Sequence, residues 1–193
     1  MILEALVTTI GLDGRLNIAP MGPEVEPGEI DRFVLKPFKT ATTYRNLIEG
    51  KEGVLHVTDD VLLIARAAIG RVENAPTRPA DVVRGEILLS AARYYEFQVT
   101  SVDDSGDRAR ISVEVVAEGR QGDLFGLNRG KYAVVEAAIL ATRLDFLPRD
   151  EVFAEFAKLE RLVEKTGGRD ERSAFALLKE YVNLSVPLER PSE

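Results

Sequence analysis

The sequence predicts an α+β fold, in which an antiparallel β core is followed by a run of helices. The first observation is Asp13-Gly14, a strong hairpin turn signal between two short apolar stretches. The second is the alternation of apolar and polar residues over 94–102 and 109–117, on either side of a polar turn at 103–107. The third is the Ala-rich segment 133–143, which favours a helix.

The N-terminal half is predicted to alternate between strands and helices. Pro20 and Pro23 end the second strand, because proline has no N–H to give to a ladder. Asp59-Asp60 precedes an apolar helix and is interpreted as its cap; a metal site is not expected, since no third oxygen ligand lies nearby in the sequence. The predicted strands are 2–10, 16–21, 32–35 and 53–58, the predicted helices are 43–48 and 61–69, and a loop is predicted at 24–31.

The C-terminal half has fewer strand signals. Residues 74–79 are predicted to form a loop with two prolines, and residues 80–92 are ambiguous. Residues 119–126 contain three glycines and are predicted to form a mobile loop. Helices are predicted at 133–143, 152–165 and 169–184, with Thr166-Gly167-Gly168 as a C-cap signal between the last two.

Composition excludes several classes of function. The absence of cysteine excludes thiolate nucleophiles, iron–sulfur clusters and Cys-ligated zinc. His56 is the only histidine, so a Ser-His-Asp triad would have to use it, and no G-x-S-x-G motif supports one. A net charge of −7 disfavours nucleic-acid binding. No apolar run reaches the length of a membrane span and no signal peptide pattern is present, so a cytoplasmic protein is expected.

The segment 35–47 carries the clearest indication of a ligand. Pro37 ends a strand and a helix follows, whose N-terminus would offer free N–H groups and a partial positive charge. Cations and hydroxyl groups around such a start favour a small anion, most simply a phosphate. The cations are Lys36, Lys39 and Arg45, and the candidate N-cap residues are Thr40, Thr42 and Thr43.

The same pattern also fits an ordinary capped helix with a solvated basic rim. Neither the phosphate-binding G-x-x-x-x-G-K-[ST] pattern nor the dinucleotide-binding G-x-G-x-x-G pattern is present. Both interpretations therefore stand on the residues alone.

Five motifs resemble the DUF447 family, whose members are mostly archaeal, and together they extend over nearly the whole chain. That family is similar to the FMN-binding split β-barrels, the fold of flavin reductases and pyridoxamine-phosphate-oxidase-like proteins. The motifs are NIAPMGP (17–23), KPFKTATTYRNL (36–47), GVLHVTDD (53–60), NRGKYAVVEAAILATR (128–143) and EKTGG (164–168).

The resemblance implies a split antiparallel β-barrel with a C-terminal helical appendage. It also implies a homodimer with FMN at the subunit interface. On this basis we expect residues 1–130 to form the flavin-binding barrel, residues 131–186 a helical appendage packed on it, and residues 187–193 a flexible tail.

The resemblance also suggests which residues hold the cofactor. FMN needs a cationic, hydroxyl-rich site for its phosphate and a backbone-lined slot for its ring. Residues at the start of the first helix would bind the phosphate, and the second strand would lie along the ring. The phosphate would contact Lys39, Thr40, Thr42, Thr43 and Arg45; the ring would lie near Asn17, Ile18, Ala19, Pro20, Met21, Lys36, Pro37 and Phe38; and Asn128, Arg129 and Lys131 would close the site from the same or the partner subunit.

Many of these residues also have a structural explanation, which stays open on the sequence. His56 in an apolar strand fits a core residue with satisfied hydrogen bonds better than a catalytic base. Phe38 fits a core position, Thr42 a helix cap, Asn46 a local hydrogen bond, Glu136 a structural role, and Arg129 and Lys131 ion pairs with Glu136 or other acids.

Two functions remain open from the sequence. One is a flavin-dependent oxidoreductase, in which the cofactor carries the electrons and the protein positions it and excludes water. This function needs no side-chain nucleophile or metal ligand, which suits a chain with one His and no Cys. The other is a non-catalytic flavin carrier, sensor or scaffold, since no obvious acid or base for a substrate stands out. A shared fold does not choose between them.

Overall fold

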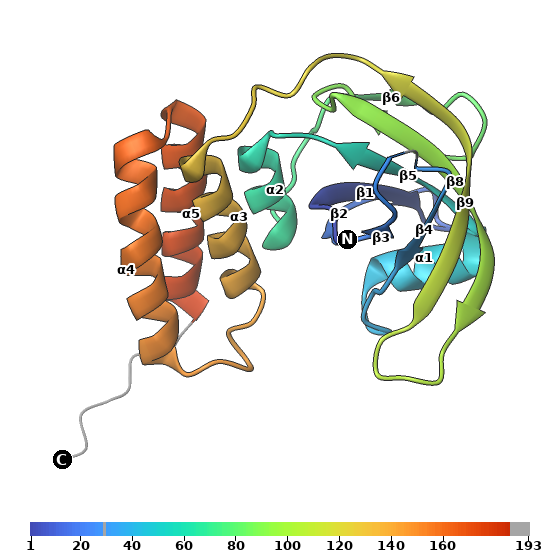
Figure 1. The fold of residues 1–193 in the computed structure, drawn as a ribbon. Helices are drawn as coiled ribbons and strands as arrows, with labels where there is room; N and C mark the ends of the chain where they lie inside the picture. The colour runs from blue at the N-terminus through green and yellow to red at the C-terminus, as the bar shows by residue number, and fades with distance from the viewer. Residues whose placement is uncertain (29, 186–193) are drawn as a thin grey trace. The chain divides into compact units, whose positions relative to one another are not determined.

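The structure is a computed structural model that describes residues 1–28 and 30–185, and it contains two compact units (Figure 1). The β unit comprises Met1–Asp59 and Asn74–Phe125. The helical unit comprises Asp60–Glu73 and the chain from Gly126 onward. The tail predicted at 187–193 lies outside the described residues.

The β unit is built on a seven-stranded antiparallel sheet with the order β2-β1-β5-β8-β9-β4-β3. Both predicted hairpins are present, because β1 pairs with β2 and β8 pairs with β9. A separate two-stranded sheet joins β6 and β7. The strands are β1 (Ala5–Ile10), β2 (Leu16–Met21), β3 (Glu24–Val25), β4 (Arg32–Leu35), β5 (Glu52–Val57), β6 (Thr77–Pro79), β7 (Glu86–Leu88), β8 (Arg93–Asp103) and β9 (Arg110–Arg120).

The sheet curls far enough for its two edges to be joined by the N-terminal segment (Figure 1). Residues 1–3 lead into β1, beside one edge strand, yet they bond to the other edge strand, β3. The Leu3 N–H donates to the Pro23 carbonyl at 3.1 Å, and the Val25 N–H donates to the Met1 carbonyl at 2.8 Å. This half-barrel of antiparallel strands confirms the predicted β core.

Apolar residues on the inner face of the curl form the core of the β unit. The rings of Phe33 on β4 and Phe97 on β8 meet edge to face, with 5.2 Å between their centroids. Helix α1 (Thr42–Gly50) contacts β1 and β2 and contributes Leu47 to this core. Its buried residues Thr43, Asn46 and Leu47 recur at helical spacing, as expected for a helix with one face toward a core.

The helical unit packs its helices around small and aromatic residues. The rings of Phe156 and Phe175 lie 5.5 Å apart. A Cβ atom on Gly130 would come within 2.8 Å of the Gly167 Cα, so glycine at this position permits a close approach of two helix ends. The helices are α2 (Val61–Ala68), α3 (Arg129–Ala141), α4 (Arg149–Thr166) and α5 (Arg169–Ser185).

Several predictions about local structure need correction. The helical unit includes residues 60–73, so the domain boundary is not the single cut at residue 130 that a linear division assumes. The predicted loops at 24–31 and 74–79 contain the short strands β3 and β6. Each of these strands pairs with the next strand along the chain, β3 with β4 and β6 with β7, and two or three residues are too few to show the alternation that marks a strand.

The cap of α2 was predicted correctly, because the Leu63 N–H donates to the Asp60 carboxylate at 3.0 Å. Among the helices that the structure describes, none is both long enough and apolar enough to cross a membrane.

Candidate functional site

The predicted phosphate and ring residues of the β unit lie on two segments that are adjacent in space. One segment is β2, and the other runs from the end of β4 through the first turn of α1. Asn17 on β2 joins them, because its amide donates to the Thr43 hydroxyl on α1 at 3.0 Å and to the Thr9 hydroxyl on β1 at 3.3 Å. The Asn46 amide donates to the same Thr9 hydroxyl at 3.1 Å. A network of short polar side chains therefore holds the start of α1 against β2.

Helix α1 begins without a side-chain cap. Its N-cap residue is Ala41, whose side chain cannot accept a hydrogen bond, so the prediction that Thr40, Thr42 or Thr43 caps the helix is wrong. The first N–H that finds a helical partner is that of Arg45, which donates to the Ala41 carbonyl at 3.3 Å. The N–H groups of the first turn consequently have no intrahelical acceptor and carry the positive end of the helix dipole.

The exposed face of this first turn carries hydroxyl groups and a cation. Thr42 and Arg45 are exposed and lie one turn apart, so they share a face of α1, and the exposed Thr40 precedes the N-cap residue. The side chains of Thr40, Thr42 and Arg45 have no hydrogen bond or ion pair with any residue that the structure describes. Thr43 differs, because only 2% of it is exposed and its hydroxyl accepts from Asn17. Thr43 therefore faces the interior.

The tip of the β8–β9 hairpin contacts the same segment. The Lys39 ammonium donates to the Asp104 backbone carbonyl, and the Tyr44 hydroxyl donates to the Asp104 carboxylate at 2.9 Å. This hydrogen bond is the main cause that raises the pKa of Tyr44, with burial and the Asp104 charge adding to it. Sequence analysis identified residues 103–107 only as a turn. The strand pairing that brings the turn to α1 is not visible in local patterns.

Phe38 is neither a core residue nor a free aromatic ring. It is 48% exposed, which contradicts the core interpretation, and the guanidinium carbon of Arg108 lies 3.9 Å from its ring centroid. Pro37 is buried, and its carbonyl accepts from the Ala109 N–H at 3.2 Å. The connection between β4 and α1 is thus held along one side by the hairpin.

Lys36 is paired with an acid on β3. Its ammonium pairs with the Glu24 carboxylate, which also accepts from the Arg110 guanidinium at 3.1 Å. The hydrogen bond from Lys36 is the largest cause that lowers the pKa of Glu24. Because Lys36 is already paired with Glu24, it is a weaker candidate for a phosphate ligand than Lys39 or Arg45.

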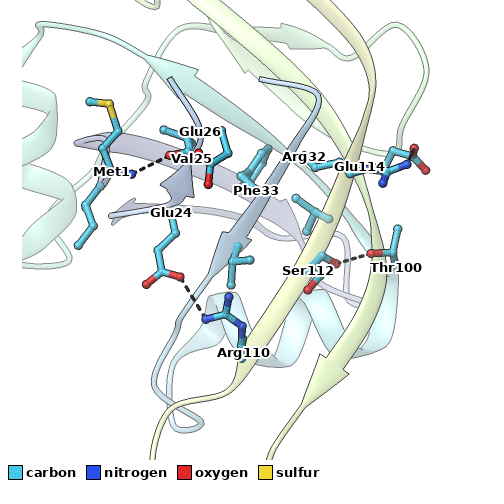
Figure 2. Close-up of a pocket in the computed structure, with 13 residues that line it drawn as sticks. Met1, Glu24, Val25, Glu26, Arg32, Phe33, Thr100, Arg110, Ser112 and Glu114 are labelled. Atoms are coloured by element: carbon cyan, nitrogen blue, oxygen red, sulfur yellow. Dashed lines mark hydrogen bonds and ion pairs between the residues drawn. The ribbon is translucent and has the colours of Figure 1, made fainter. Parts of the chain in front are cut away.

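A groove of about 830 Å³ lies on the outer face of the sheet beside this ion pair (Figure 2). Its walls come from the N-terminus and from β3, β4, β8 and β9, and none of the predicted cofactor residues lines it. It contains two ion pairs, Glu24 with Arg110, and Arg32 with Glu114, each at 3.1 Å. Because its arginines are paired with carboxylates and none of the predicted cofactor residues lines it, the groove is not the candidate site.

Strand β2 exposes a free backbone edge, since it pairs with β1 alone. Pro20 lies opposite Leu6, and a proline in an edge strand turns its nitrogen away from the ladder. Backbone groups alternate in direction along an antiparallel strand, so Ile18 also turns its N–H and C=O toward the free edge. Ala19 and Met21 are half-buried on the same strand.

The C-terminal candidates Asn128, Arg129 and Lys131 belong to the helical unit. Asn128 caps α3 by accepting from the Lys131 N–H at 3.1 Å, and its amide donates to the Thr166 carbonyl at 3.0 Å. The Lys131 ammonium lies 3.0 Å from the Glu171 carboxylate, so Lys131 pairs with an acid other than Glu136. Arg129 is exposed. Structural roles within the helical unit account for Asn128 and Lys131, and their contact with a cofactor stays a prediction.

His56 is a core residue with satisfied hydrogen bonds, as expected. It is fully buried on β5; its Nδ1 lies 3.3 Å from the Leu6 carbonyl, and its Nε2 accepts from the Leu88 N–H at 3.1 Å. Burial lowers its pKa to about 4. A neutral imidazole with both nitrogens occupied is not available as a base.

The sequence profile of a known family extends over both halves of the chain. Residues 3–121 match the model described as "Protein of unknown function (DUF447) N-terminal domain", and residues 128–180 match the one described as "Protein of unknown function (DUF447)". The chain belongs to the DUF447 family. The resemblance seen in its motifs is therefore confirmed.

Solved structures place this DUF447 chain in a wider fold group. It is similar to an FMN-bound DUF447 protein from Methanosarcina mazei, with 23% identity, a TM-score of 0.82, and coverage of 93% of this chain and 94% of that chain. An FMN-binding protein from Thermus thermophilus matches with 19% identity and a TM-score of 0.54, covering 61% of this chain and 71% of that one. Nitrilotriacetate monooxygenase component B from Bacillus cereus matches with 18% identity and a TM-score of 0.52, covering 61% of this chain and 68% of that one.

At these identities the likeness establishes the fold. The DUF447 chain has an antiparallel split-barrel sheet of the type found in FMN-binding proteins, followed by a C-terminal helical part. This confirms the predicted fold class.

Proposed function

We propose that this protein binds FMN, with the phosphate at the start of α1 and the ring along the free edge of β2. The observation that carries the proposal is the first turn of α1. It has N–H groups without a side-chain cap, and on its exposed face Thr42 and Arg45 have no protein partner among the described residues. Such a turn matches a phosphate dianion in charge and in hydrogen-bond donors.

The residues around this turn fit the rest of the cofactor. Thr40 and Lys39 precede the turn and extend the set of donors. The outward N–H and C=O groups of Ile18 on β2 provide a donor and an acceptor for the polar edge of a flavin ring. Of the similar proteins, one is FMN-bound and matches over 93% of this chain, and another is an FMN-binding protein.

Of the possible roles for an FMN-binding protein, we favour a flavin-dependent oxidoreductase. The flavin supplies the electron-transfer chemistry when it is bound. The residues of this chain hold the phosphate, fix the ring against β2 and keep water from one side of it. Similarity to nitrilotriacetate monooxygenase component B supports this class. A non-catalytic flavin carrier remains the second candidate, because His56, the only histidine, is buried and occupied by backbone groups.

A homodimer is part of the same proposal. Thr42 and Arg45 are exposed, and so is the free edge of β2, so one protomer encloses a flavin from one side only. A second copy could cover the other side. Sedimentation velocity with and without FMN tests this: a monomer under both conditions would refute the dimer without affecting FMN binding.

The absorption spectrum of the purified protein tests the cofactor. We expect flavin bands in the visible range, or their appearance as perturbed bands when FMN is added, together with a higher melting temperature. Colourless protein whose melting temperature is unchanged by FMN would refute the proposal. Turnover of the FMN-bound protein with NADH, NADPH or a reduced deazaflavin would then support an oxidoreductase, whereas no turnover with any of the three would favour the carrier.

A further inference from the structure

The β8–β9 hairpin, although distant in sequence, holds the phosphate-binding segment through several contacts. The hairpin tip and the connection between β4 and α1 are joined at Phe38 and Arg108, where a β-bridge and a cation–π contact coincide. The Ala109 N–H donates to the Pro37 carbonyl at 3.2 Å. At the far end of the tip, Asp104 contacts two residues on either side of the helix start.

Lys39 is held by a neutral acceptor. Its ammonium donates to the backbone carbonyl of Asp104, and it forms no ion pair with a described residue. A carbonyl fixes the position of an ammonium group without cancelling its charge, whereas the Glu24 carboxylate pairs directly with Lys36. Lys39 is thus held beside the start of α1 by a neutral group, with the charge of the Asp103 carboxylate acting on it but no ion pair to a described residue.

Tyr44 ties the helix itself to the same tip. It occupies the first turn of α1, and its hydroxyl donates to the Asp104 carboxylate at 2.9 Å. An uncapped first turn is the part of a helix that frays most readily. The contact between Tyr44 and Asp104 therefore restrains the N–H groups that would face a phosphate.

We propose that the Asp104 tip is a positioning element for the phosphate site, and that the contact between Tyr44 and Asp104 determines how strongly the protein prefers FMN over riboflavin. This inference rests on the proposed function. Neither residue needs to touch the cofactor: Asp104 acts through Lys39 and Tyr44, and Tyr44 acts through the backbone of the first turn. Only the phosphorylated flavin uses these groups, so the effect must appear in the ratio of the two affinities.

Tyr44→Phe removes a single hydroxyl and leaves the ring in place. We expect it to raise the Kd for FMN by about five- to tenfold and to change the Kd for riboflavin by less than about twofold, since the charge-assisted hydrogen bond to Asp104 that restrains the first turn is lost. Asp104→Asn keeps an oxygen for Tyr44 and the backbone carbonyl for Lys39. We therefore expect it to retain wild-type preference for FMN or to bind FMN up to about threefold more tightly, because a negative charge near the phosphate is removed.

Thr100→Val is the matched control, because the Thr100 hydroxyl bonds to the Ser112 carbonyl within the same hairpin, at 3.1 Å and away from α1. We expect it to leave both affinities unchanged. Fluorescence titration with the two flavins measures all three variants, and melting temperatures identify any variant that fails to fold. Equal losses for FMN and riboflavin in Tyr44→Phe, or no loss for either, would overturn this inference while FMN binding by the wild type stood. Absence of FMN binding by the wild type would instead refute the proposed function.

Discussion

Two regions of the β unit contain similar polar residue types but differ in burial and in hydrogen bonding. Beneath the β6–β7 hairpin, Thr8, His56 and Glu96 are all fully buried and all bind the hairpin backbone. At the start of α1, the side chains of Thr40, Thr42 and Arg45 are exposed and have no protein partner among the described residues. The difference teaches that residue type alone does not indicate a ligand site. A polar group that is already satisfied by the protein supports the fold, whereas a group left with free hydrogen-bonding capacity is available to a ligand.

Glu96 shows that the buried polar groups beneath the β6–β7 hairpin are fully hydrogen-bonded. Its carboxylate accepts from the N–H groups of Asp81, Val82 and Val83 at 2.8, 2.7 and 2.9 Å. Together with the Thr8 hydroxyl, which donates to the Glu86 carbonyl at 2.6 Å, it anchors the hairpin at both ends of its loop. Sequence analysis missed Glu96, because a single acid in an alternating strand carries no signal of burial.

Removing the Glu96 carboxylate should have the largest effect of the substitutions considered, and the effect is on stability. Glu96→Ala leaves the N–H groups of residues 81–83 without their acceptor in a buried place, so we expect a loss of about 3–5 kcal/mol in unfolding free energy. Urea unfolding followed by circular dichroism measures it. Glu114→Ala on β9, which breaks only the exposed pair with Arg32, is the control and should cost about 0–1 kcal/mol. Similar losses for the two variants would contradict the assignment of Glu96 as a buried anchor.

The buried His56 should make stability depend on pH. Burial lowers its folded pKa to about 4, whereas the unfolded chain titrates near the ordinary value of 6.5. As pH decreases, the unfolded state therefore gains a proton before the folded state does. The unfolding free energy keeps its full value above about pH 6.5 and falls by about 3 kcal/mol as pH decreases to about 4. Denaturant titrations at several pH values, compared with His56→Gln, measure this. If the two proteins lose stability in parallel over this range, another group is responsible.

Arg45→Ala tests the exposed polar region at the start of α1. An exposed arginine without a protein partner should contribute little to folding, so we expect a stability change within about 0.5 kcal/mol. The Kd for FMN should increase by about tenfold to a hundredfold, because a charge-assisted contact with the phosphate is lost, and the Kd for riboflavin should stay nearly constant. Arg161→Ala, an exposed arginine on α4, controls for net charge. Equal weakening of both flavins would move the phosphate away from Arg45.

A substitution at Lys131 tests an ion pair of the helical unit. The main effect expected from it is the smallest in free energy of the four substitutions. Its ion pair with Glu171 is mostly shielded from solvent, and Glu171 also accepts from the Gly168 N–H at 2.7 Å. We expect Lys131→Met to lower the unfolding free energy by about 1–2 kcal/mol, between the values for exposed and buried pairs. Calorimetry measures this, and flavin titration of the same variant tests its predicted place at the cofactor. A large loss of FMN affinity without a loss of stability would show that the ion pair is secondary.

Local patterns predicted much of the fold. Asp13-Gly14 and the alternation around residues 103–107 both mark hairpins that are present, and Asp60 caps α2 as expected. The cap of α1 was predicted wrongly, because three threonines within four residues each satisfy the same propensity, whereas in the structure the N-cap is Ala41 and the Thr43 hydroxyl is bonded to Asn17. The division of the chain was also misjudged, since α2 joins helices that lie about sixty residues further along the sequence.

By itself the sequence determined the α+β class, the main hairpins, the buried place of His56 and the segment with the candidate anion site. These follow from turn chemistry, from hydrophobic period and from the clustering of charge, all of which act over a few residues. Only the tertiary structure decided that Lys36 pairs with Glu24 while Lys39 bonds to a backbone carbonyl, that Thr43 faces inward, and that Asp104 reaches the start of α1. Those outcomes depend on which distant strands become neighbours, and a long-range pairing leaves no trace in the local order of residues.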